Sequence, residues 1–263
     1  MVLNVEDLNQ QGGEIDRLLR LKTYPIAVKM LQKKEDIPVG AKQPAKDLGY
    51  HLALCQAISQ ARRQGRSIAL LKEDMWCFEP VLGLGMAEIP EYFLEGYNRY
   101  PGSARTLEAG RTWAQSFPHL EAGRYIGVSV APLATANFLP DLFMLYTDGS
   151  QLTQLLLAKN WMDGGDITST LSGHAACVYA MVPVLQDRQF QIAVPCFGDR
   201  RRGLASDEEN IFSGPIELLG ELVAGLSHFK EIGEGLPMPH LMLTEYKLRD
   251  AYVKIGRMIG MEV

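Results

Sequence analysis

Apolar residues along the chain fall into two patterns, short continuous runs and longer runs with helical spacing. The continuous runs predict buried strands at residues 24–31, 67–71, 125–133, 142–146 and 190–194. The helical spacing predicts helices at residues 15–21, 49–64, 104–116, 150–160, 176–185, 215–226 and 244–258. This alternation of strands and helices favours an α/β or α+β fold, with mixed sheets and flanking helices.

The order of these elements repeats along the chain. Each copy has a strand, a helix that opens on a cysteine, a second strand, a Cys-Phe loop and a further helix. The copies end alike, with Phe-x-x-Leu-x-x-Gly at residues 117–123 and Phe-x-x-Ile-x-x-Gly at residues 229–235. We therefore expect an internal duplication with pseudo-symmetric halves at 1–123 and 124–235 and a C-terminal helical tail at 236–263, all in one compact unit.

The cysteines occupy matching positions in the two copies. Cys55 and Cys177 open the helices, and Cys77 and Cys196 follow the second strands. A pseudo-twofold axis would bring such positions together, and four thiolates suit zinc or an iron–sulfur cluster. No Cys-x-x-Cys is present, so inert core thiols, a disulfide and a reactive thiol remain alternatives. Glycines that follow the strand-end cysteines would let backbone amides approach sulfur or a cofactor, and the candidates are Gly83, Gly85 and Gly198.

Other polar residues cluster near the cysteines. Asp199-Arg-Arg-Arg-Gly follows Cys196, and arginines on a glycine-flanked loop can bind an anion, with Arg200 and Arg201 as the candidates. The alternative is a solvated loop whose charge balances the acidic residues at 207–209. His51 and His174 precede the two helix-opening cysteines, and each is either a ligand or proton donor or simply a polar loop residue.

Composition narrows the class of protein. The chain has 263 residues, 47% of them apolar, and a net charge of −5. This negative net charge does not indicate the basic surface that binding to nucleic acid requires. No apolar run is long enough to cross a membrane, and the acidic N-terminus does not resemble a signal peptide. We expect a cytoplasmic protein with reduced or metal-bound cysteines, of an oligomeric state that these patterns do not specify.

Several segments together resemble the prokaryotic family known as domain of unknown function 169. They are Tyr-Pro-Ile-Ala-Val at residues 24–28, Cys-Gln-Ala at 55–57, Cys-Phe-x-x-x-x-Gly-Leu-Gly at 77–85, Pro-Asp at 140–141 and Cys-Phe-Gly-Asp-Arg at 196–200. The resemblance covers nearly the whole chain. It implies a grouping and no activity.

The leading hypothesis is a cysteine-ligated metalloprotein. It would bind a [4Fe-4S] cluster, or alternatively zinc, through Cys55, Cys77, Cys177 and Cys196. With every ligand supplied by protein, the group would serve electron transfer or structure, acting on an anionic small molecule or a redox partner protein. The alternatives are a small-molecule binding module without a metal, whose cysteines are structural, and a thiol-dependent enzyme.

Overall fold

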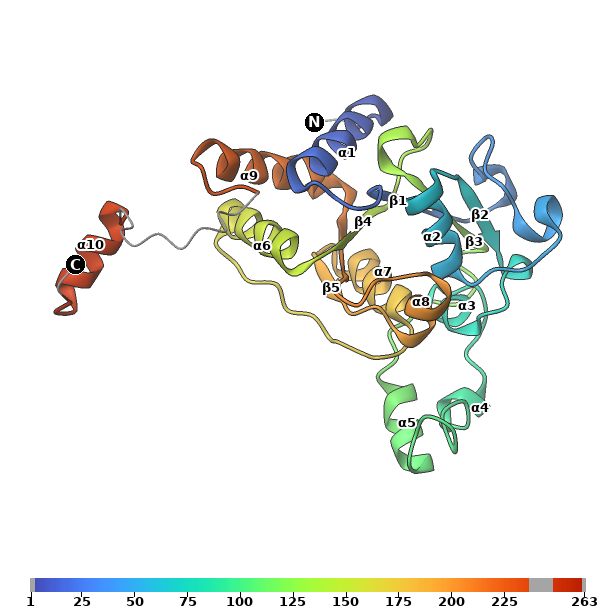
Figure 1. The fold of residues 1–263 in the computed structure, drawn as a ribbon. Coiled ribbons are helices and arrows are strands. Elements are labelled where there is room, and N and C mark those ends of the chain that lie inside the picture. Colours follow the sequence, from blue (N-terminus) through green and yellow to red (C-terminus); the bar gives the residue numbers. More distant parts are fainter. Residues whose placement is uncertain (1–2, 237–247, 262–263) are drawn as a thin grey trace.

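The computed structural model describes residues 3–236 and 248–261. Its centre is a six-stranded antiparallel sheet in the order β2-β3-β1-β4-β6-β5 (Figure 1). The strands are β1 (Ile26–Leu31), β2 (Ile68–Leu71), β3 (Gly127–Pro132), β4 (Leu142–Thr147), β5 (Gln191–Ala193) and β6 (Asn210–Pro215). The mixed helix-and-strand class predicted from the sequence is confirmed, with every strand pair antiparallel.

The sheet consists of two strand triplets with the same internal order. In the first triplet β3 lies between β1 and β2, and in the second β6 lies between β4 and β5. The triplets join where β1 pairs with β4. A duplication would produce this arrangement, but strand order by itself does not establish one, and the duplication stays a prediction. β3 lies beyond residue 124, the predicted start of the second half, yet it pairs only with strands of the first.

Two layers of helices cover the sheet (Figure 1). The first layer contains α2 (Leu54–Gln64), α3 (Phe78–Gly83), α7 (Ala176–Asp187) and α8 (Phe197–Arg202). The second contains α1 (Val5–Leu19), α6 (Gly149–Asp163) and α9 (Leu219–Glu231). A hydrophobic core lies between the sheet and each helix layer. Successive strand residues point alternately into the first and the second core, as the two-residue period of a strand requires. On β4, Leu142 and Met144 enter the first core, while Phe143 and Leu145 enter the second.

The remaining helices lie away from these layers. Two of them, α4 (Glu91–Leu94) and α5 (Leu107–Gln115), pack together beside the first layer, and α10 (Asp250–Met258) lies near the C-terminus. The last helix was expected to begin at residue 244, and residues 244–247 lie outside the described part. None of the helices in the described ranges combines the length and the apolar character needed to cross a bilayer.

Several local predictions differ from the structure, and the helix expected at residues 15–21 is α1, which spans Val5–Leu19. The segments that follow Cys77 and Cys196 are short helices, α3 and α8, where loops were expected. The strand β6 was not predicted, and the helix expected from residue 215 begins at Leu219 after a 3-10 turn. Gly214 is one reason why the strand was missed, because glycine in a sequence usually indicates a turn. In the structure this glycine allows close packing in the sheet, since a Cβ there would lie 2.5 Å from the Phe190 ring.

Candidate functional site

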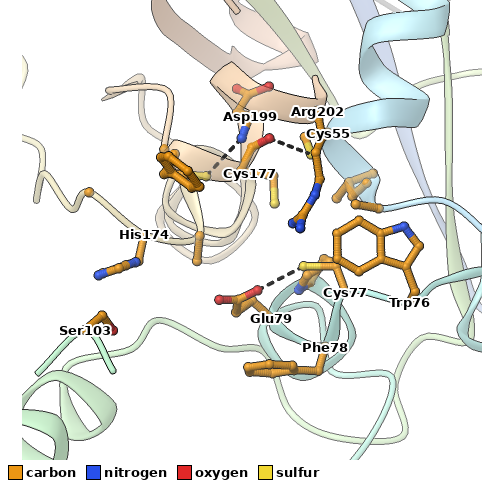
Figure 2. Close-up of a pocket in the computed structure, with 18 of the residues that line it drawn as sticks. Cys55, Trp76, Cys77, Phe78, Glu79, Ser103, His174, Cys177, Asp199 and Arg202 are labelled. Atoms are coloured by element: carbon orange, nitrogen blue, oxygen red, sulfur yellow. Dashed lines mark hydrogen bonds between the residues drawn. The ribbon is translucent and has the colours of Figure 1, made fainter. Parts of the chain in front are cut away.

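A cavity of about 560 Å³ lies among α2, α3, α7 and α8 and is lined by all four cysteines. Figure 2 shows the labelled cysteines together with the aromatic and charged side chains around them. The polar and aromatic part of the lining comprises Cys55, Trp76, Cys77, Phe78, Glu79, Arg99, Ser103, His174, Cys177, Cys196, Phe197, Asp199 and Arg202. Four thiols from four separate segments therefore share one cavity.

Each cysteine stands at the N-terminal end of a helix. Cys55 and Cys177 are the second residues of α2 and α7, and Cys77 and Cys196 are the N-caps of α3 and α8. The helices also pack crosswise, because α2 contacts α8 and α3 contacts α7. Elements of the two triplets thereby meet around the cavity, which explains why thiols distant in sequence converge.

Three of the thiols have hydrogen-bond partners. The Cys77 Sγ donates to Glu79 Oε2 at 2.9 Å, and the Cys55 Sγ donates to the Gly198 carbonyl at 3.9 Å. The Cys196 Sγ accepts from the Asp199 backbone N–H at 3.4 Å. Gly198 is thus the predicted glycine that does contact a cysteine, through its carbonyl oxygen.

Burial raises the pKa of Cys55, Cys77 and Cys177, so these three thiols are protonated at neutral pH. It raises the pKa of Cys55 to about 12, with a further contribution from the charges of Asp199 and Cys196. Burial raises the pKa of Cys77, helped by Glu79, and raises that of Cys177. An activated cysteine nucleophile needs the opposite shift, so these pKa values disfavour a thiol enzyme that uses Cys55, Cys77 or Cys177.

A buried polar network, here called the inner network, lies behind α8. Arg62 makes a bidentate ion pair with Glu209, with nitrogen–oxygen distances of 2.8 and 3.0 Å. The Arg62 guanidinium lies 3.9 Å from the centre of the Tyr146 ring. The Tyr146 hydroxyl donates to Asp199 Oδ2 at 2.9 Å. Burial raises the pKa of Asp199 to about 6, against the opposing effects of Tyr146 and Arg62. Through Asp199 the network anchors the first turn of α8, whose N-cap is Cys196.

A second network, here called the wall network, lies on the cavity wall itself. Arg99 donates from Nη2 to Glu79 Oε1 at 3.3 Å, and its Nη1 lies 3.2 Å from His174 Nδ1. Its guanidinium stacks 3.8 Å from the centre of the Trp113 ring. Burial, followed by the charge of Arg99, lowers the pKa of His174, so this imidazole is neutral at pH 7. Because Glu79 also accepts from Cys77, a continuous polar chain runs from that thiol to His174.

The three consecutive arginines point in different directions. Arg200 donates to the Ser206 carbonyl at 2.7 Å and lies 3.9 Å from Asp207. Arg201 lies 5.8 Å from the centre of the Phe197 ring and does not line the cavity. Arg202, which was not singled out from the sequence, does line it and stacks 4.5 Å from the centre of the Trp76 ring. The short helix α8 decides this, since successive helical residues point about 100° apart.

Of the remaining glycine and histidine candidates, some line the cavity and others do not. Gly83 and Gly85 lie outside the lining. Gly83 instead lets α3 approach α7, because a Cβ there would lie 2.4 Å from a methyl carbon of Val178. His51 is exposed and lies outside the cavity, whereas His174 lines it.

Some lining residues were missed by sequence reasoning. Glu79 reaches the cavity from the first turn of α3 and Arg99 from the segment after α4, and no local motif marks either. A charged residue two positions after a candidate cysteine was the only available indication for Glu79. Arg99 is placed by the tertiary structure alone.

The donor set does not form a ready single-ion site. Within residues 3–236 and 248–261, no group of three or more His, Cys, Asp or Glu side chains is arranged so that it could hold a metal ion. A tetrahedral zinc site has zinc–sulfur bonds of about 2.3 Å, so its sulfurs lie within about 4 Å of one another. The thiols of this cavity, as arranged here, do not meet that requirement.

The fold and the cavity define a mixed helix-and-sheet protein with a four-cysteine site. The chain belongs to the family domain of unknown function 169, described as "Uncharacterised ArCR", whose family model matches residues 14–225. An uncharacterized protein of Methanocaldococcus jannaschii is 23% identical over 233 residues, which cover 88% of this chain and 98% of that protein. No solved structure is significantly similar to the chain. All four cysteines lie within the family match.

Proposed function

We propose that the chain binds a [4Fe-4S] cluster through Cys55, Cys77, Cys177 and Cys196, and that it exchanges electrons with an anionic small molecule or a partner protein. The observation behind the proposal is the placement of these four thiols on the wall of one cavity. Four cysteine thiolates are the usual ligand set of such a cluster. A reducing cytoplasm, as expected from the sequence, would keep these free thiols available.

The arrangement of the described residues counts against a single zinc ion. Zinc needs four sulfurs packed around one atom, and the described residues offer no such group. A cubane cluster would distribute its thiolates over four irons around a larger volume. The cavity lined by the thiols would have to provide that volume.

Residues of the chain would set the reduction potential of the bound cluster. A cluster supplies one-electron exchange, at a potential set by hydrogen bonds to sulfur, charge and solvent exposure. The Asp199 N–H already donates to the Cys196 Sγ and would stabilise its thiolate. The helix N-termini at all four cysteines act in the same direction. Glu79 accepts a hydrogen bond from Cys77 and is positioned to receive the proton that metal binding releases.

Anaerobic purification with metal analysis tests the proposal. We expect a brown protein with broad visible absorption and about four irons and four sulfides per chain. Cys177→Ser should lose most of the iron, because one missing ligand opens the cluster. Ser103→Ala is the matched control, since Ser103 lines the same cavity without a thiol. A colourless protein that takes up no iron on anaerobic reconstitution would contradict the proposal.

A metal-free binding module is the second candidate. The cavity volume of about 560 Å³ is typical of small-molecule sites. Trp76, Phe78 and Phe197 line it and remain 45%, 47% and 68% exposed, so they offer apolar surface to a ligand. This candidate predicts ligand binding that is unchanged when Cys177 is replaced by serine.

A further inference from the structure

The charges around the cysteine cavity do not all have partners within the protein. Glu79 is paired with Arg99, and the Asp199 carboxylate accepts from Tyr146 in the inner network. His174 is neutral at pH 7, since burial and Arg99 lower its pKa. Among the described lining residues, Arg202 is therefore the cation without an anionic partner, and Asp199, whose Oδ1 is buried without a hydrogen-bond partner, is the carboxylate without an ion pair.

Arg202 is held over the cavity by an aromatic ring. Its guanidinium lies 4.5 Å from the centre of the Trp76 ring, and Figure 2 shows both side chains at the cavity beside Cys77. No hydrogen bond or ion pair of its side chain is found among the described residues, in contrast to neighbouring Arg200. A stacked guanidinium keeps its in-plane N–H donors free for a planar, bidentate acceptor.

Arg99 adds no free donor to this site. Its two terminal nitrogens pair with His174 and Glu79, and its Nε is buried out of reach of solvent. Arg202 is therefore the free cationic donor among the described residues of the lining.

The remaining lining determines the kind of anion. The exposed rings of Trp76, Phe78 and Phe197 favour a ligand with an apolar, planar body. Glu79 and the thiols, once ionised by a metal, disfavour a second negative charge nearby. A monoanion therefore fits the cavity better than a phosphate dianion.

We propose that the cavity binds a small carboxylate with a planar apolar body, its carboxylate paired with Arg202 and its body against the exposed aromatic rings. This deepens the proposed function and rests on it, because it names the substrate class of the same site. The carboxylate would lie beside the four cysteines, where an electron could pass to or from the bound molecule.

Calorimetry with phenylacetate tests this on the full chain, both as purified anaerobically and after metal removal. We expect phenylacetate to bind with an affinity that falls as salt rises, and phenylacetamide, its neutral counterpart, to bind at least about tenfold more weakly. Phenyl phosphate should also bind more weakly than phenylacetate. Arg202→Gln should weaken phenylacetate binding by about tenfold or more.

Arg201→Gln is the matched control, because Arg201 is the adjacent residue of the same helix and does not line the cavity. It should keep phenylacetate binding unchanged. Equal effects of the two substitutions, equal binding of acid and amide, or no binding at all would overturn the inference. So would an altered cluster potential in Arg202→Gln without carboxylate binding, which would assign Arg202 to the cluster alone.

Iron content separates this inference from the proposed function. Iron present without phenylacetate binding overturns the carboxylate site and leaves the cluster. Phenylacetate binding that depends on Arg202 in a chain that takes up no iron keeps the site and removes the cluster.

Discussion

The inner network and Arg202 of the cavity wall differ in how their charges are compensated. In the inner network, the Arg62 side chain is 0% exposed and its partner Glu209 is 3% exposed. At the cavity wall, Arg99 has a partner in Glu79, but Arg202 extends over the cavity without one among the described residues. The Arg62–Glu209 pair is buried and compensated, and the charge of Arg202 is available to a ligand.

This difference separates residues that stabilise the fold around the cavity from residues that would bind a ligand in it. Loss of one member of the inner network leaves a buried charge alone, which is among the most destabilising changes known. Loss of an exposed cation at the cavity leaves the fold intact and removes only what it would bind. Three substitutions therefore test the comparison, in order of expected effect on stability.

Glu209→Ala should have the largest effect. It leaves the Arg62 guanidinium buried without its bidentate partner, and such changes lower the free energy of unfolding by about 3–5 kcal/mol. Denaturant unfolding measures this. Glu208→Ala is the control, because Glu208 is an exposed neighbour that pairs only with Lys22, and it should change stability little. Equal losses in the two variants would contradict a special role for the inner network.

Asp199 should make stability depend on pH. Burial raises its pKa from 3.8 to about 6 in the folded chain, so the folded state binds a proton that the unfolded state has released between these values. Its contribution to stability is therefore fully present below pH 4 and is lost as pH rises through 6, a change of about 3 kcal/mol.

The measurement is the free energy of unfolding of the natural chain minus that of Asp199→Asn, followed from pH 4 to pH 7. This difference should decline by about that amount as pH rises. Asp207→Asn, at an exposed position on the loop after α8, should show no such trend. A flat difference for Asp199 would place its carboxyl in a more polar environment than the inner network provides.

Arg202→Gln should have the smallest effect on stability. The side chain is exposed and makes one stacking contact, with Trp76, so the free energy of unfolding should change by about 0.5 kcal/mol or less. The same variant should lose phenylacetate binding. A large loss of stability would assign Arg202 to the scaffold and remove its contrast with the inner network.

Local sequence patterns predicted much of the scaffold. The strand at residues 24–31 and the helices opening near Cys55 and Cys177 follow from apolar spacing, and the structure confirms them as β1, α2 and α7. The short helices α3 and α8 were missed, since six residues carry too little periodicity. The strand β6 was missed because its Gly214 and Pro215 resemble a turn, and its burial between β4 and β5 overrides that preference.

The sequence identified part of the cavity lining. The four cysteines stood out from spacing alone, and the structure brings them to one cavity. Arg200 and Arg201 were the candidates among the three arginines, whereas the turn of α8 places Arg202 at the cavity. Arg99 carried no local indication, because its place on the wall depends on how the segment after α4 folds back toward Glu79.

The sequence by itself determined which residue types are available and that helices open at Cys55 and Cys177, because these features depend on neighbours along the chain. Only the tertiary structure decided which of these residues meet. Strand pairing and the crosswise packing of α2 with α8 and of α3 with α7 join segments far apart in sequence. Burial then raises the pKa values of Cys55 and Asp199, since desolvation depends on everything packed around a group and not on its place in the chain.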